Sequence, residues 1–79
     1  MMIQWGAVTP TGSGYKTFTV TTLQFSSTPY WAWNTVEFDD TTGAYLTGFI
    51  NDKGYMTASR IKFAGYGGVI NRWIAIGKA

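Results

Sequence analysis

The chain has 79 residues, a formal net charge of +2, 13% charged and 18% aromatic residues, and neither cysteine nor histidine. Without those two residue types it cannot form disulfides, hold zinc through thiolates or imidazoles, or use a Ser-His-Asp or Cys-His nucleophile. The net charge is too small to indicate a nucleic-acid groove by itself, and no apolar run is long enough to span a membrane. We therefore expect no cofactor, no bound metal and no membrane insertion.

The length predicts one small domain over residues 1–79. A monomer of this size buries only about 60% of the surface that its unfolded chain exposes. Small domains usually gain further stability from disulfides, metals or partner subunits. We therefore expect the chain to associate with identical copies. Its opening residues, MMIQWG, lack the basic and apolar regions of a signal peptide, so we expect no export signal.

Apolar and polar residues alternate with a period of two along most of the chain, whereas helical spacing is almost absent. Turn-forming residues separate the alternating runs. The predicted strands span residues 2–8, 15–23, 30–38, 44–50, 55–63 and 69–77. The predicted turns span residues 10–14, 26–29, 39–43, 51–54 and 64–68. This pattern predicts an all-β domain, a six-stranded antiparallel β-sandwich.

The second predicted strand, residues 15–23, alternates most cleanly. Phe18 and Val20 are predicted to face inward. The intervening threonines are predicted to face outward, because a β-branched polar residue suits a half-exposed strand.

The third predicted strand carries an unusual combination of side chains. Trp31 and Trp33 share a face with the carboxylates Glu37 and Asp39, whereas the opposite face is mainly apolar and is predicted to join the core. Exposed indole rings can stack on the C–H face of a sugar while polar groups bind its hydroxyls. Tryptophan is also enriched at subunit interfaces, so packing against another subunit is the alternative.

The last predicted strand, residues 69–77, is apolar on both faces. Trp73 and Ala75 lie on one face, and Ile74 and Ile76 lie on the other. A strand of an antiparallel sheet normally has one face toward water. This strand is therefore predicted to be central and covered twice, once by the domain's own second sheet and once by a neighbouring subunit.

Two further residues are candidates for ligand contact. Arg72 lies between Ile70 and Ile74 on an apolar face, where a guanidinium needs a carboxylate partner such as Asp39 or binds sugar hydroxyls at a rim. Tyr66 is flanked by glycines in a predicted exposed loop, where it can contact a ligand or cover the core. The candidate glycan contacts are Trp31, Trp33, Asp39, Tyr66 and Arg72.

Catalysis and nucleic-acid binding are the other classes to weigh. Glu37, Asp39 and Asp40 are close in sequence, but the run DDTTG is typical of a solvated turn rather than of a glycosidase carboxylate pair. We therefore do not expect an enzyme. Basic residues such as Lys53 and Lys62, with aromatic residues on a small β-barrel, leave a single-stranded nucleic-acid binder as an alternative.

Four segments occur together in a recognisable order: IQWG near the start, QFSSTPYWAW in the middle, TGF at 47–49, and RWIAIG near the end. In this combination the chain resembles the C-terminal domains of bacteriophage and prophage tail fibres, of the small type related to H-type lectins. The resemblance covers essentially all 79 residues. It implies structural roles for the residues of these segments, among them Trp5, Phe25, Pro29, Phe49 and Trp73.

The resemblance also implies an assembly and a function. It implies a homotrimer at the distal tip of a fibre, assembled in the host cytoplasm and carried on the virion. Its implied ligand is a bacterial surface polysaccharide or lipopolysaccharide. We therefore expect an adhesion domain for host recognition. A cap that only trimerises and registers the fibre, without ligand binding, is the alternative within the same class.

Overall fold

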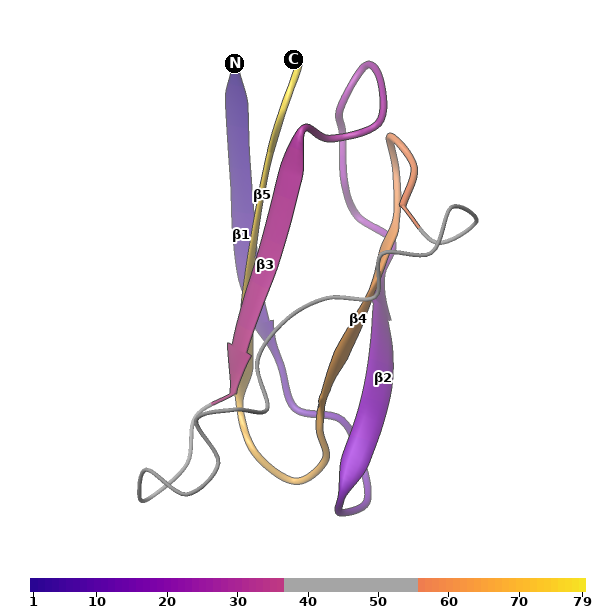
Figure 1. Ribbon diagram of the computed structural model, residues 1–79, viewed down its shortest axis with the longest axis vertical. Helices are drawn as coiled ribbons and strands as arrows, with labels where there is room; N and C mark the ends of the chain where they lie inside the picture. The colour runs from indigo at the N-terminus through magenta and orange to yellow at the C-terminus, as the bar shows by residue number, and fades with distance from the viewer. Residues whose placement is uncertain (37–55) are drawn as a thin grey trace.

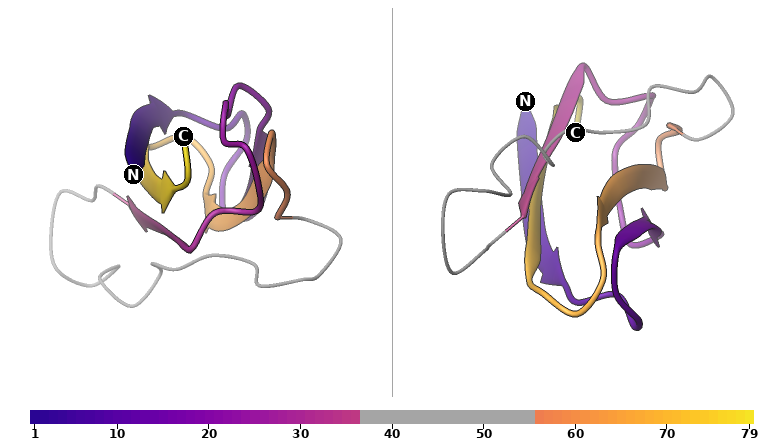
Figure 2. Two further views of the ribbon diagram at one scale, coloured as in Figure 1. Left: turned by 90° about the horizontal axis from the view of Figure 1, so that it is seen from above. Right: turned by 60° about the horizontal axis from the view of Figure 1, so that its bottom comes forward.

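The computed structural model describes residues 1–36 and 56–79, which form two antiparallel sheets (Figure 1). The first sheet has the strand order β1-β5-β3, and the second contains β2 and β4. The strands are β1 (Met2–Val8), β2 (Tyr15–Val20), β3 (Trp31–Val36), β4 (Ile61–Tyr66) and β5 (Asn71–Gly77). Viewed from above, the two sheets lie on opposite sides of the molecule (Figure 2).

The predicted all-β fold with antiparallel pairing is confirmed. Five of the six predicted strands are present, although most are shorter than expected. The remaining predicted strand, residues 44–50, lies outside the described residues, as do the turns predicted at 39–43 and 51–54. The six-strand count therefore stays a prediction.

The core fills the space between the sheets. Phe63 and Ile61 of β4 are completely buried, and the Phe63 ring lies 5.3 Å from the ring of Phe18 and 6.3 Å from that of Trp73. These contacts join β2, β4 and β5 across the sandwich. Burying one such side chain contributes about 1.5–3 kcal/mol. The inward orientation predicted for Phe18 and Val20 is confirmed, and the threonines that alternate with them are exposed.

The prediction for β4 was wrong at both ends. The expected strand covered residues 55–63, but Met56 forms only an isolated bridge with Ile61. Between them the Thr57 hydroxyl accepts hydrogen bonds from the backbone N–H groups of Ser59 and Arg60, at 3.4 and 3.2 Å, which forms a tight turn. The strand proper begins only after this turn.

At its other end, β4 continues through the residues that were predicted to turn. Gly65 is a strand residue, paired with Lys16 of β2. A Cβ atom at this position would overlap the Asn71 side-chain oxygen and lie 3.0 Å from the Phe18 ring. Glycine is therefore used here for close packing and not for a turn.

Two buried asparagines connect the sheets. The Asn71 side chain accepts a hydrogen bond from the Tyr66 N–H at 3.0 Å and donates to the carbonyls of Tyr66 and Val69, both at 2.9 Å. The Asn34 side chain of β3 donates to the Ala64 carbonyl of β4 at 2.8 Å. β3 and β4 belong to different sheets and share no backbone pairing. The asparagine side chains therefore provide the hydrogen bonds that join the two sheets here.

The predicted central position of the last strand is confirmed. β5 lies between β1 and β3 and is antiparallel to both. Met2 lies opposite Gly77, so the first and last strands of the chain are side by side (Figure 1). Trp73 and Ala75 are buried against the second sheet. The opposite face of β5 is not covered by that sheet.

Candidate functional site

The side of the β1-β5-β3 sheet that faces away from β2 and β4 is rich in large apolar residues. We call its nine residues the outer face. Strand register arranges them in three rows: Ile3–Ile76–Trp31, Trp5–Ile74–Trp33 and Ala7–Arg72–Thr35. Two adjacent rows thus consist only of tryptophan and isoleucine.

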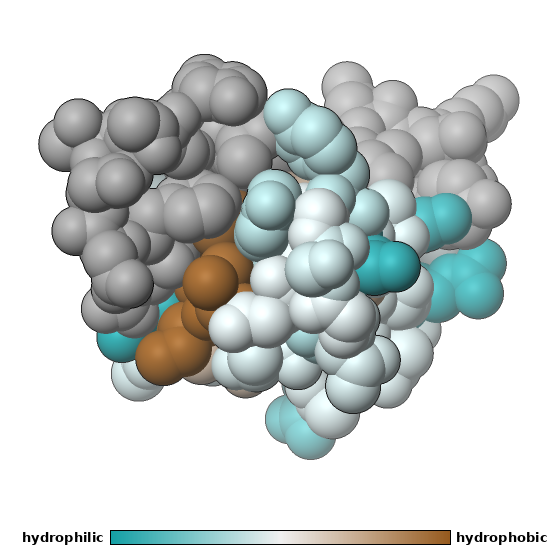
Figure 3. All heavy atoms as spheres, turned by 90° about the horizontal axis from the view of Figure 1, so that it is seen from below, coloured by the Kyte–Doolittle hydropathy of each residue, from teal (hydrophilic) through white to brown (hydrophobic). Residues whose placement is uncertain are grey.

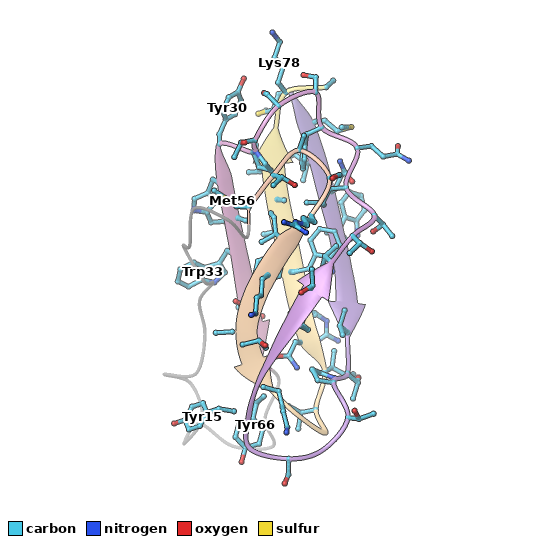
Figure 4. The ribbon with its side chains drawn as sticks, turned by 90° about the vertical axis from the view of Figure 1, so that its right-hand side faces the viewer. Tyr15, Tyr30, Trp33, Met56, Tyr66 and Lys78 are labelled. Carbon is cyan, nitrogen blue, oxygen red and sulfur yellow. The ribbon has the colours of Figure 1, made fainter. Side chains whose placement is uncertain are left out.

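The tryptophans of the outer face are largely accessible. Trp5 is 74% exposed, Trp31 44% and Trp33 39%. The rings of Trp31 and Trp33 are parallel, with centroids 6.5 Å apart. Trp33 extends from β3 away from the other strands (Figure 4). The three indoles alone expose on the order of 350 Å², the scale at which an apolar patch on a monomer often marks a contact site.

The surface beyond this sheet has a different character. Seen from below, most of the described surface has intermediate hydropathy, strongly hydrophilic groups are sparse, and hydrophobic residues gather in one patch (Figure 3). The low charge content of the sequence accounts for the pale surface, because threonine, serine and glycine take the place of charged residues.

The structure brings three of the predicted contact residues together. Trp31, Trp33 and Arg72 all belong to the outer face, with Arg72 in the row next to Trp33. Arg72 is exposed, which fits the rim position that was one of its two predicted roles, and its pairing with a carboxylate such as Asp39 stays a prediction. The alternation of β5 had indicated its face correctly but not its solvent exposure. Asp39 lies outside the described residues.

Tyr66 is not in an exposed loop, contrary to prediction. It is the last residue of β4 and is half-buried, and its ring packs edge-to-face against the ring of Tyr15 with centroids 6.0 Å apart. The two tyrosines lie together at one end of the molecule (Figure 4). Tyr66 therefore belongs to the second sheet and does not contribute to the outer face. The strand continues through Gly65, which is why the loop prediction failed.

A groove of about 370 Å³ lies between β1 and the end of β2. Residues 5–8 of β1, residues 19–22 and Trp73 line it. Among the described strands, β1 and β2 stand at the ends of their sheets, so the groove follows the space between these two strands. A Cβ atom at Gly6 would lie 2.9 Å from the Trp73 indole nitrogen, so glycine is what lets this indole reach the groove.

Sequence reasoning did not identify this groove. Thr19 and Thr21 were interpreted only as outward residues of a strand, Thr22 was given no role, and Trp73 was interpreted as a structural residue. The signal that could have found it is Gly6 within a predicted strand, because glycine there often marks a close approach of another group. The pairing of Gly6 with Trp73 is set by strand register, which the sequence alone did not provide.

Residues 1–36 and 56–79 contain no group of three or more histidine, cysteine, aspartate or glutamate side chains placed to hold a metal ion. In the same residues no helix has the length and apolar character needed to cross a membrane.

Comparison of the chain with known protein families, with curated proteins and with solved structures found no significant match. The resemblance to tail-fibre domains therefore depends on the quoted segments alone. The segment TGF at 47–49 lies outside the described residues, whereas the other three segments contribute to one sheet. IQWG lies in β1, the WAW of the middle segment begins β3, and RWIAIG lies in β5. All three belong to the sheet that carries the outer face.

Proposed function

We propose that this protein is a receptor-binding domain from the tip of a phage tail fibre, which associates as a homotrimer and binds a bacterial surface glycan. The observation that carries the proposal is the outer face, with its two rows of tryptophan and isoleucine on a sheet whose other side already covers the core. The family resemblance supplies the trimer and the fibre, because its segments form this sheet.

Association through the outer face is energetically reasonable. Covering about 350 Å² of indole surface contributes roughly 9 kcal/mol per protomer at 25 cal/mol per Å². The loss of translational and rotational freedom costs about 4–15 kcal/mol, so the gain and the cost are of similar size. The three isoleucines add to the gain. A closed ring of three chains uses such a face on every protomer and leaves none exposed.

The glycan part of the proposal rests on surface chemistry. A surface rich in threonine, glycine and aromatic rings, with few charges, offers hydroxyls and flat apolar rings together. Such groups suit uncharged polyhydroxyl ligands. Weak affinity at each site would be raised by several copies acting together.

Light scattering of the purified protein tests the association. We expect a mass of three chains for the wild type and of one chain for Trp33→Lys, because a lysine in the tryptophan–isoleucine rows cannot be buried without a partner. Thr17→Lys is the matched control, since Thr17 is exposed on the second sheet and should leave the trimer intact. A wild-type protein that stays monomeric at every concentration, well folded by circular dichroism, would contradict the proposal.

Binding to immobilised lipopolysaccharide and capsular polysaccharide tests the ligand. We expect the trimer to bind material from at least one bacterial host. A trimer that binds none, but whose deletion stops fibre assembly, would identify the trimerisation cap instead. Binding to single-stranded DNA that falls steeply with salt would identify the nucleic-acid alternative.

A further inference from the structure

We propose that the groove between β1 and β2 is the site that holds one pyranose ring of the glycan. This inference rests on the proposed glycan-binding function and gives it a location. It differs from the sequence prediction, which placed the contacts on Trp31, Trp33, Asp39, Tyr66 and Arg72. Trp5, at the β1 edge of the outer face, also lines the groove. The rest of the outer face is then an assembly surface and the groove is the ligand site.

The composition of the groove fits an uncharged sugar. Trp5 and Trp73 supply indole surface, and Thr19, Thr21 and Thr22 supply three hydroxyl groups. None of the lining residues is charged. A threonine hydroxyl both donates and accepts hydrogen bonds, as sugar hydroxyls do. The threonine side of the groove can therefore bind a pyranose ring in more than one orientation. The volume of about 370 Å³ lies within the range of small-molecule clefts.

The backbone adds further hydrogen-bonding groups. β1 and β2 each stand at the end of the strand order given by the described residues. An edge strand presents N–H and C=O groups that its own ladder does not use. Two such edges border this groove, so a ligand can be bound by main-chain groups as well as by threonine hydroxyls.

The outer face lacks this combination. Of its nine residues only Arg72 and Thr35 are polar, and both lie in the last row. A sugar stacked over the indoles of the other two rows would find no polar side chain within those rows to bind its hydroxyls. Those rows therefore suit an apolar partner surface better than a sugar.

An NMR titration of the ¹⁵N-labelled protein with neutral pyranoses tests the site. The probes are glucose, galactose, mannose, rhamnose and N-acetylglucosamine. We expect at least one of them to bind with a dissociation constant on the order of 1 mM. The indole signals of Trp5 and Trp73 should shift, and those of Trp31 and Trp33 should not. This map requires no substitution.

Substitutions then test the hydroxyls. The triple variant Thr19→Val, Thr21→Val, Thr22→Val keeps the β-branched shape and should weaken binding more than about 10-fold. Serine at the same three positions should retain binding. Thr17→Val is the matched control, because Thr17 lies on β2 like Thr19 but does not line the groove. This variant should bind the sugar with the affinity of the wild type.

The outcomes separate this inference from the proposed function. Wild-type affinity in the valine variant, or shifts confined to Trp31 and Trp33, overturns the groove site while glycan binding stands. Failure to bind every pyranose while whole polysaccharide still binds also overturns the single-ring site. Failure to bind both overturns the site and the glycan function together.

Discussion

The two faces of the β1-β5-β3 sheet differ in a way that is opposite to the usual arrangement. The inner face of β5 carries Asn71, Trp73, Ala75 and Gly77, all buried, so only one of its four residues is large and apolar. The outer face of the same sheet carries three tryptophans and three isoleucines. Over all three strands the inner face carries four larger apolar side chains, Met2, Val8, Val36 and Trp73. Large apolar side chains are thus more numerous on the outer face, which the second sheet does not cover.

The inner residues are small because the other side of the sandwich fills the space. A Cβ atom at Gly77 would lie 2.7 Å from the Phe25 ring. Phe18 and Phe63 occupy the remaining volume between the sheets. The inner face therefore packs within one chain, whereas the tryptophans of the outer face stay exposed. The exposed tryptophans of this sheet therefore contribute little to the stability of the single chain and are available to pack against another surface.

The largest expected effect on the free energy of unfolding comes from replacing one tryptophan of each face with alanine. Trp73→Ala should cost about 3–5 kcal/mol, because it opens a cavity in the core. Trp5→Ala should cost less than about 1 kcal/mol in a single chain, because Trp5 is 74% exposed. Urea denaturation at low protein concentration, followed by circular dichroism, measures both. Equal losses would remove the distinction between the faces.

An intermediate effect is expected from the two buried asparagines. Asn71→Ala leaves one N–H and two carbonyls without their partner and should cost about 3 kcal/mol, whereas Asn34→Ala frees one carbonyl and should cost about 1 kcal/mol. The buried Asn34 oxygen also has no hydrogen-bond partner among residues 1–36 and 56–79, so within these residues the side chain makes a single hydrogen bond. Hydrogen exchange provides a second readout. The Tyr66 amide should lose protection in Asn71→Ala and keep it in Asn34→Ala.

The smallest expected effect is that of salt on association. Arg72 is the only charged residue of the outer face, so raising sodium chloride from about 0.05 to 0.5 M should change the association constant by less than about threefold. Ammonium sulfate should strengthen association, because it favours burial of apolar surface. Sedimentation velocity measures both. A steep loss of association with sodium chloride would indicate that charge pairs and not the indoles hold the copies together.

Much of the fold could be predicted from local pattern. Period-two alternation identified β1 with its observed bounds, the inward residues of β2, and the central position of β5. The same alternation placed Trp31, Trp33 and Arg72 on faces that the structure brings together. Alternation succeeds here because successive side chains of a strand point to opposite sides whatever the strand packs against.

Contacts between distant segments could not be predicted in this way. Gly65 was interpreted as part of a turn, but its place in β4 depends on Asn71, which occupies the space of a side chain. Tyr66 changed from a loop residue to a strand residue for the same reason. The solvent exposure of Arg72 depends on which segments pack against the sheet, and the alternation within one strand does not show this.

The sequence by itself determined the all-β class and the two sides of each strand, because both follow from the geometry of one extended segment. Only the tertiary structure decided which strands are neighbours, and with them the rows of the outer face and the groove in which Gly6 meets Trp73. The rows of the outer face and the groove arise from contacts between segments that are far apart in the sequence, such as Met2 and Gly77. Their geometry is set by register and packing, which depend on every strand at once.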